Sequence, residues 1–117
     1  MMKRTIAALA LVLTATMAVP AAQAGTTANS TIVQLKVLEK SHPNYRLFHG
    51  ALWLQYDKAK TNYRWGGKHC ADQELSDIKV SMLFAAFRSK YSLSIDYRQV
   101  TYKAKTYRCI TGFTVRR

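Results

Sequence analysis

The chain has 117 residues, which is enough for one small domain and excludes a large multidomain protein. It contains 18 Lys and Arg but only 6 Asp and Glu, a formal net charge of +12, so anionic partners are expected. The competing interpretation is a basic surface that only keeps the protein soluble. The six carboxylates and three histidines show no spacing typical of acid–base catalysis or metal binding. We therefore expect a binding protein, not an enzyme, with no catalytic residue, no metal site and no cofactor.

Residues 1–24 have the features of a cleavable export signal. A basic start precedes an apolar run over residues 6–19, and the Ala-Gln-Ala sequence at 22–24 has the small-x-small pattern that signal peptidase recognises. The run is too short to cross a bilayer stably. We expect a secreted or periplasmic protein cleaved after Ala24; a retained anchor or an ordinary helix is the alternative. Two of the 18 Lys and Arg lie in the signal, so 16 basic and 6 acidic residues remain, a formal charge of +10.

The elements after the signal begin with a leader and three strands. Residues 25–30 are small and polar, which predicts a flexible leader. Period-two alternation predicts strands over 31–39, 47–56 and 63–70, and Gly50 inside the second indicates a bulge or a sharp coil of the sheet. The apolar side chains expected to share one face of the first strand are Val33, Leu35 and Val37.

The period then changes to that of a helix. Val80, Leu83, Phe84 and Phe87 recur at i, i+3, i+4 and i+7, which predicts an amphipathic helix over about 75–90. Ser76 or Asp77 is expected to cap its start.

Two strands close the chain. Alternation predicts them over 93–98 and 107–115, joined by a basic connection at 100–105. The fold class is therefore mostly β with one helix, in the order βββαββ. We expect a single domain over 31–117, a five-stranded OB-type Greek-key barrel. An open sheet with one helix packed on it is the alternative.

The two cysteines, Cys70 and Cys109, are expected to form a disulfide in an oxidising compartment. In the OB topology the third and fifth strands are neighbours, which would bring these residues together. A bond that closes so long a loop stabilises by roughly 3–4 kcal/mol in the chain-entropy description. A metal site is the weaker alternative, because only His69 adjoins either cysteine.

Aromatic residues alternate with cations in several segments. Aromatic faces stack on sugars or nucleobases, while Arg and Lys bind carboxylates or phosphates. Trp53 is a surface candidate because the alternation points it away from Leu52 and Leu54. Tyr97 is followed by Arg98 in the fourth strand; the alternative for Tyr97 is a place in the core. The residues that form this pattern are Tyr45, Arg46, Trp53, Tyr63, Arg64, Trp65, Tyr97, Arg98, Tyr102, Lys103, Lys105, Tyr107 and Arg108.

Two segments resemble a known family. Residues 29–35 place a Ser before the first strand, and residues 93–98 form an apolar-x-Ile-x-Tyr strand after the helix. In these features the chain resembles the OB-fold binding (B) subunits of subtilase cytotoxin and of pertussis-like pentameric toxins. That family joins its second and third strands by a disulfide, whereas the second strand here has no cysteine.

The resemblance implies several functional features. It implies a homo-oligomer, a pentamer, that partners a catalytic A subunit. It assigns Ser30 to the carboxylate of an acidic glycan and Tyr97 to the sugar ring or its acyl group. The plain alternative is that Ser30 ends the leader and Tyr97 fills the core.

The sequence thus predicts an exported, non-enzymatic binding domain for acidic glycans. The candidate ligand-binding residues are Ser30, Trp53, Tyr97 and Arg98. The alternatives are a general binding module for anionic polymers, such as nucleic acid or lipopolysaccharide, and a small envelope accessory protein with an acidic partner.

Overall fold

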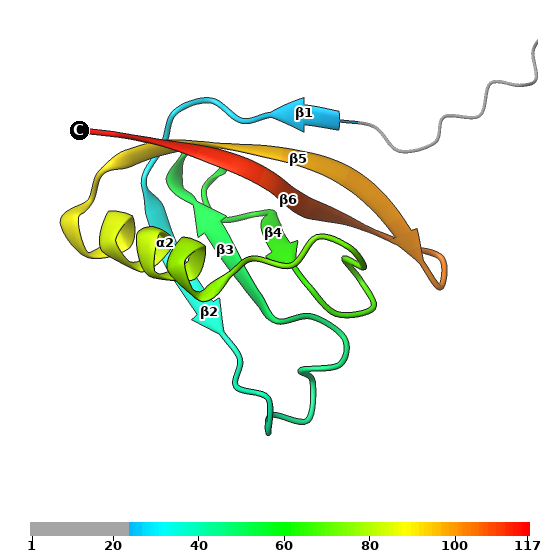
Figure 1. Ribbon diagram of the computed structural model, residues 1–117. Coiled ribbons are helices and arrows are strands. Elements are labelled where there is room, and N and C mark those ends of the chain that lie inside the picture. Colours follow the sequence, from blue (N-terminus) through cyan, green and yellow to red (C-terminus); the bar gives the residue numbers. More distant parts are fainter. Residues whose placement is uncertain (1–23) are drawn as a thin grey trace, which may run out of the picture.

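The computed structural model describes residues 24–117, so the predicted export signal, apart from Ala24, lies outside the described residues. Within them the fold is mostly β with one α-helix and one short 3-10 helix (Figure 1). The elements are β1 (Ala24–Thr26), β2 (Ile32–Val37), β3 (Gly50–Leu54), η2 (Gln55–Asp57), β4 (Asn62–Trp65), α2 (Asp77–Ser89), β5 (Ser92–Tyr102) and β6 (Lys105–Arg116).

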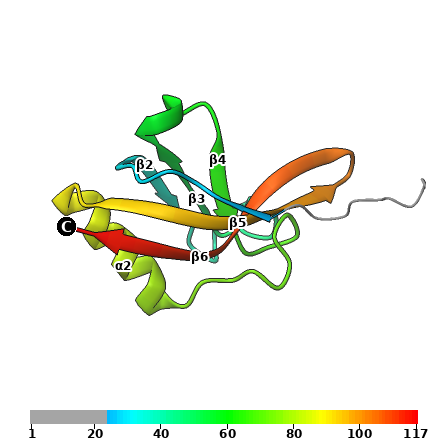
Figure 2. The ribbon, with the colours of Figure 1, turned by 90° about the horizontal axis from the view of Figure 1, so that it is seen from above.

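The strands form one open, six-stranded sheet in the order β1-β5-β6-β4-β3-β2 (Figure 2). All neighbours are antiparallel except β4 and β6, which are parallel. The expectation of a closed barrel of five strands is therefore wrong. The sheet has a sixth strand, β1. The pairing of the N-terminal segment with β5 ends at the Ser30–Leu93 bridge, so β2 and β5 form no ladder in the described chain.

Residues 25–30, expected to be a flexible leader, are bonded to β5 instead. β1 pairs with residues 96–98 of β5, and Thr27 N donates to Ile95 O at 2.9 Å. The peptide groups of Ser30 and Leu93 exchange bonds of 2.9 and 2.7 Å. A Cβ on Gly25 would lie 2.7 Å from the Tyr97 hydroxyl oxygen. The small residues of this segment therefore allow its backbone to approach β5 closely, and they do not indicate a flexible leader.

The first predicted apolar face is only partly formed. The register of β2 shifts between Ile32 and Gln34, which is a bulge. Ile32 is buried and Leu35 half-buried, whereas Val33 and Val37 are exposed. A bulge adds one residue to one strand, so the residues on its two sides no longer share the alternation of a regular strand.

The second and third strands are shorter than the sequence indicated. Gly50 begins β3 and is not a mid-strand bulge; it is glycine because a Cβ there would overlap the Trp65 ring. β4 ends at Trp65, not at residue 70, because Gly66 and Gly67 turn the chain with φ of 73° and 71°.

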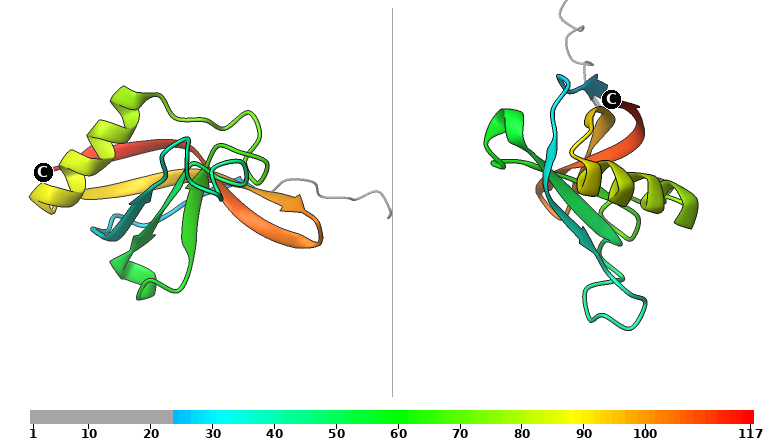
Figure 3. Two further views of the ribbon diagram at one scale, coloured as in Figure 1. Left: turned by 90° about the horizontal axis from the view of Figure 1, so that it is seen from below. Right: turned by 90° about the vertical axis from the view of Figure 1, so that its left-hand side faces the viewer.

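The helix α2 lies along one face of the sheet (Figure 3). Its N-cap is Ser76, whose Oγ accepts a hydrogen bond from Lys79 N at 3.3 Å. Leu83 and Ala86 are buried, but Phe84, expected on the same face, is half exposed. The main core consists of Ile32, Leu52, Leu54, Tyr63, Trp65, Leu83, Ala86, Leu93, Ile95 and Ile110.

The last two strands form one long hairpin. Their pairing runs from Ser92↔Arg116 to Tyr102↔Lys105, so most of the predicted basic connection at 100–105 is strand. The turn consists of Lys103 and Ala104, which both have positive φ, 50° and 70°, as a two-residue hairpin turn that follows the strand twist requires. The tip of this hairpin extends beyond the rest of the sheet (Figure 2).

The predicted disulfide is confirmed. Cys70 and Cys109 are bonded, with their Cα atoms 5.5 Å apart, and both are fully buried. A structural disulfide indicates an oxidising, non-cytoplasmic compartment. In the part of the chain that the structure describes, none of the helices has the length and apolar character needed to span a membrane.

Candidate ligand-binding cleft

A cleft lies where β4 and β6 separate. These parallel strands pair only at Tyr63↔Arg108 and Arg64↔Cys109, and ahead of these pairs the hairpin diverges from the segment that leads into β4 (Figure 2). The space between them has a volume of about 490 Å³. The residues that line it are Lys60, Thr61, Asn62, Arg64, Gln99, Thr106, Tyr107 and Arg108.

The lining of the cleft is cationic and rich in polar groups. It includes the side chains of Lys60, Arg64 and Arg108, and among its lining residues in the described chain there is no carboxylate. Two amides and three hydroxyls accompany the cations. Cations attract carboxylates, sulfates or phosphates, while amides and hydroxyls can both donate to and accept from ligand hydroxyls.

Arg64 lies between two aromatic rings. Its guanidinium carbon is 4.2 Å from the centroid of the Phe48 ring and 4.7 Å from that of Tyr107. The His69 ring is parallel to both rings, within 8° and 7°, and Arg64 Nη1 lies 2.7 Å from His69 Nδ1. The guanidinium and the imidazole therefore lie side by side in one layer between the two rings. We call Phe48, Arg64, His69 and Tyr107 the Arg64 stack.

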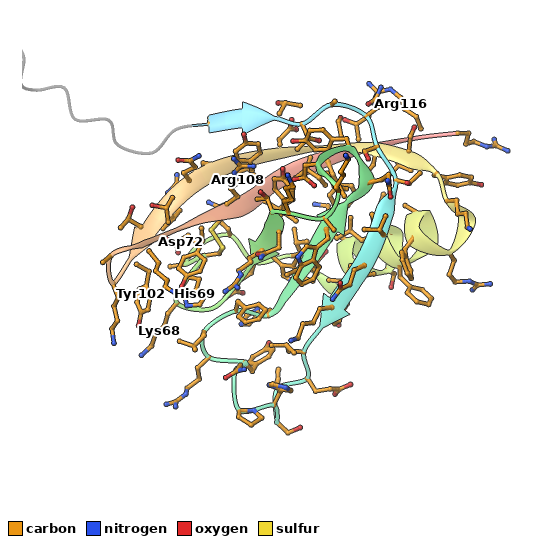
Figure 4. The ribbon with its side chains drawn as sticks, turned by 180° about the vertical axis from the view of Figure 1, so that it is seen from behind. Lys68, His69, Asp72, Tyr102, Arg108 and Arg116 are labelled. Atoms are coloured by element: carbon orange, nitrogen blue, oxygen red, sulfur yellow. A yellow bond between two sulfur atoms is a disulfide. The ribbon has the colours of Figure 1, made fainter. Side chains whose placement is uncertain are left out.

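The hydrogen bond in this stack defines the state of His69. An arginine can only donate, so His69 Nδ1 accepts and the ring is neutral, with its proton on Nε2. Burial lowers the pKa of His69, and the positive charges of Arg64 and Lys105 lower it further. Tyr102 from the hairpin contacts the same imidazole, with ring centroids 5.3 Å apart (Figure 4). Burial also lowers the pKa of Arg64, which remains charged at neutral pH.

Arg64 keeps donors for a ligand. Its Nε donates to Asn62 Oδ1 at 2.9 Å, and both of its identified partners, Asn62 and His69, are neutral. Two of its five N–H groups take these bonds, which leaves three for an anion bound in the cleft. Neither of these partners is an anion, so an anionic ligand would meet a cation that they leave uncompensated.

Arg108 lies among tyrosines beside the same seam. Its Nη1 donates to the Tyr63 hydroxyl at 3.1 Å, and its guanidinium carbon is 5.1 Å from the centroid of the Tyr97 ring. The Tyr63 hydroxyl also lies 3.2 Å from that of Tyr56. Burial, assisted by the Tyr56 hydrogen bond, raises the pKa of Tyr63, so this hydroxyl stays protonated. Arg108 is thus positioned by neutral groups, as Arg64 is.

The loops that hold the Arg64 stack are bonded to each other and to the disulfide. Lys68 N donates to Arg46 O, and His69 N donates to Leu47 O, each at 2.9 Å. Cys70, next to His69, is bonded to Cys109 of β6. The bond that closes the loop therefore fixes the residue that orients Arg64.

Two of the predicted ligand residues have structural partners. The Ser30 hydroxyl accepts a hydrogen bond from Tyr56 N at 2.9 Å, which holds η2 to the segment before β2. Tyr97 packs at the edge of the main core and above Gly25, with its ring 5.5 Å from that of Tyr63. Neither residue lines the cleft, but Tyr97 contacts Arg108, which does.

The other two predicted residues also lie outside the cleft. Trp53 is half-buried and packs with Phe48 in a small cluster on the other side of the sheet from α2. It faces Asn62 across the β3–β4 ladder. Arg98 is exposed on β5, opposite Cys109. The structure therefore does not bring the four predicted residues into one site.

The residues that the sequence reasoning missed come from short segments far apart in the chain. Lys60, Asn62 and Gln99 belong to no motif, and only the pairing of β4 with β6 brings them together. The signal that was present is the alternation of rings and cations at Tyr63-Arg64 and Tyr107-Arg108. Combined with the expected adjacency of the third and fifth strands, it would have placed both arginines at one seam.

Comparison with known proteins gives no relative: no protein-family model, curated protein or solved structure matches this chain. Within residues 24–117 there is also no group of three or more His, Cys, Asp or Glu residues that could hold a metal ion.

Proposed function

We propose that this protein is an exported, non-enzymatic binding domain that holds an acidic glycan in the cleft between β4 and the β5–β6 hairpin. The supporting observation is the lining of that cleft, which combines three cations with two amides and three hydroxyls. A carboxylated or sulfated sugar offers an anion for Arg64 or Arg108. Its ring hydroxyls match the amides of Asn62 and Gln99.

The aromatic geometry favours a sugar over a nucleobase. Binding of single-stranded nucleic acid relies on exposed ring faces on which successive bases stack. Near the cleft, the rings of Phe48 and Tyr107 pack on Arg64 and His69. The cleft therefore offers more hydrogen-bonding groups than free aromatic faces.

The strand neighbours support an OB-type relationship as a finer proposal. β4 and β6, the third and fifth strands of the predicted set, are adjacent, as that topology requires. We propose a partly open version of it with β1 added at the edge of β5. The sequence resemblance further proposes that the protein is related to the toxin B subunits. That relationship would imply a pentamer and a catalytic A subunit. Tyr97→Phe tests its glycan site, since unchanged glycan affinity would rule out the assigned role of Tyr97.

The cleft is tested by Lys60→Met, with Lys40→Met as a control that makes the same charge change at an exposed residue of the loop over residues 38–49. The cleft proposal expects Lys60→Met to weaken binding of an acidic oligosaccharide in titration calorimetry, by about tenfold if one charge-assisted bond is lost. Lys40→Met should bind as the unchanged protein does. Equal affinities for the two variants would contradict the proposed site. A glycan array with no acidic binder would contradict the proposed ligand class.

A general affinity for anionic polymers is the second candidate, favoured by the excess of 16 basic over 6 acidic residues after the signal. It predicts binding to heparin, lipopolysaccharide and DNA alike, with an affinity that falls steeply as salt rises. A specific glycan site predicts a preference among sugars of equal charge at one salt concentration. Titration of two isomeric acidic oligosaccharides therefore separates the two functions.

A further inference from the structure

The exposed apolar side chains of the molecule gather on two neighbouring elements. Among residues 24–117, six large hydrophobic side chains are exposed, and all but Tyr56 lie on β2 and α2. These five are Val33, Val37, Ile78, Met82 and Phe84, with exposed fractions of 40, 52, 73, 47 and 49%. We call them the β2–α2 face.

The two elements lie side by side in opposite directions. Val37 and Asp77 line one surface depression, and Val33, Phe87 and Arg88 line another. The start of α2 is therefore near the end of β2, and its end is near the start of β2 (Figure 3). At 3.6 residues per turn, Phe84 falls on the same side of the helix as Asp77 and Arg88, so it lies toward β2.

The helix α2 has apolar residues beyond those that pack into the core of the domain. Leu83 and Ala86 are buried against the sheet, while Ile78 and Met82, which precede Ala86 at intervals of four residues, are exposed. A helix that is apolar around most of its circumference is normally covered on both sides. An exposed apolar patch on a small soluble domain marks an interaction surface.

The charges at the two ends of α2 favour a second copy of the chain as the partner that covers this face. Glu74 and Asp77 are exposed at the start of α2, and Arg88 and Lys90 are exposed at its end. An identical helix in the reverse direction would place each acidic end against a basic end. The two helix dipoles would also be opposed, which is favourable. A two-fold interface has this self-complementary character, because each contact occurs twice.

We propose that a second copy of this chain covers the β2–α2 face, with the two α2 helices antiparallel about a two-fold axis. The 13 residues of α2 make a face roughly 20 Å long. Such a face is smaller than a standard stable interface. We therefore expect a dissociation constant of the dimer on the order of 10–100 µM.

The first test measures mass against concentration. Sedimentation equilibrium of the mature protein in about 0.15 M salt, which screens its overall positive charge, should show the mass doubling as concentration rises. Ile78→Glu should stay monomeric and keep its melting temperature, because the side chain is already 73% exposed. Ala71→Glu, an exposed site on a loop elsewhere, should dimerise normally. A monomer at every concentration would overturn the proposal. A pentamer would also overturn it, and would favour the kinship with the toxin B subunits instead.

The second test probes the antiparallel arrangement. Asp77→Arg alone and Arg88→Asp alone should each weaken self-association, because each creates two like-charge contacts across the interface. An equimolar mixture should regain it, since every position 77 then meets an opposite charge at position 88 of the other copy. A mixture that associates no better than either variant would overturn the geometry. If Asp77→Arg fails to fold because it places a cation in the first helical turn, Ile78→Glu still decides the dimer.

Discussion

Removal of the disulfide should cost both stability and the arrangement of the cleft. The bond joins residues 39 apart in sequence, and the chain-entropy relation for a loop of that length gives about 4 kcal/mol at 25 °C. For a domain of this size, 1 kcal/mol corresponds to roughly 4–8 °C, so Cys70→Ala with Cys109→Ala should lower the melting temperature by about 15–30 °C.

Thermal unfolding followed by tryptophan fluorescence suits this measurement, because Trp65 is fully buried in the main core. The control is the unchanged protein in reductant, which should melt close to the double variant. A fall of less than about 5 °C would refute the reasoning, since the loop would then be held by its other contacts. A variant that still folds at low temperature should also bind the acidic oligosaccharide more weakly, because the loop that carries His69 is no longer tied to β6.

Two further predictions concern single residues of the fold. The lowered pKa of His69 means that the unfolded chain takes up a proton before the folded one does, so stability should fall as pH drops below about 6.5. Melting temperatures between pH 5 and 7 should show this decline, and it should flatten in His69→Gln; a parallel decline in the variant would refute the role of His69. Gly50→Ala should cost more than about 2 kcal/mol, because its Cβ would overlap the Trp65 ring. Gly112→Ala, whose nearest neighbour is an Asp96 carboxylate oxygen at 3.3 Å, should cost much less in urea denaturation, and equal costs would contradict the packing argument.

The sequence predicted the elements with strong periodicity and failed where a tertiary contact decided the conformation. The helix and its Ser76 cap follow from a 3.6-residue period and from local hydrogen bonding. The disulfide follows from the number of cysteines and the expected compartment. β1 could not be found, because three small residues form a strand only where β5 offers an edge to pair with. The sheet remains open because the pairing of this N-terminal segment with β5 ends at the Ser30–Leu93 bridge, before β2 begins.

The candidate site was predictable in its chemistry but not in its position. Composition predicted a cationic surface with aromatic residues, and the cleft has that character. Its members were not found because their proximity depends on a parallel pairing of only two residue pairs. Ser30 and Tyr97 were assigned by resemblance. The structure gives both of them internal partners, Tyr56 N and the Gly25–Tyr63 region.

The two proposed surfaces together predict how the protein would bind a surface that carries many acidic glycans. The β2–α2 face and the tip of the hairpin lie at different ends of the molecule (Figure 1), so a dimer formed through α2 leaves both clefts open. Two linked sites raise the apparent affinity for a dense array of ligands without any new contact. Ile78→Glu should therefore leave the affinity for a free oligosaccharide unchanged and weaken binding to a glycan-coated surface by about tenfold or more. Surface plasmon resonance at high and low glycan density measures this difference. An equal response of the variant and the unchanged protein at high density would show that the two clefts do not act together.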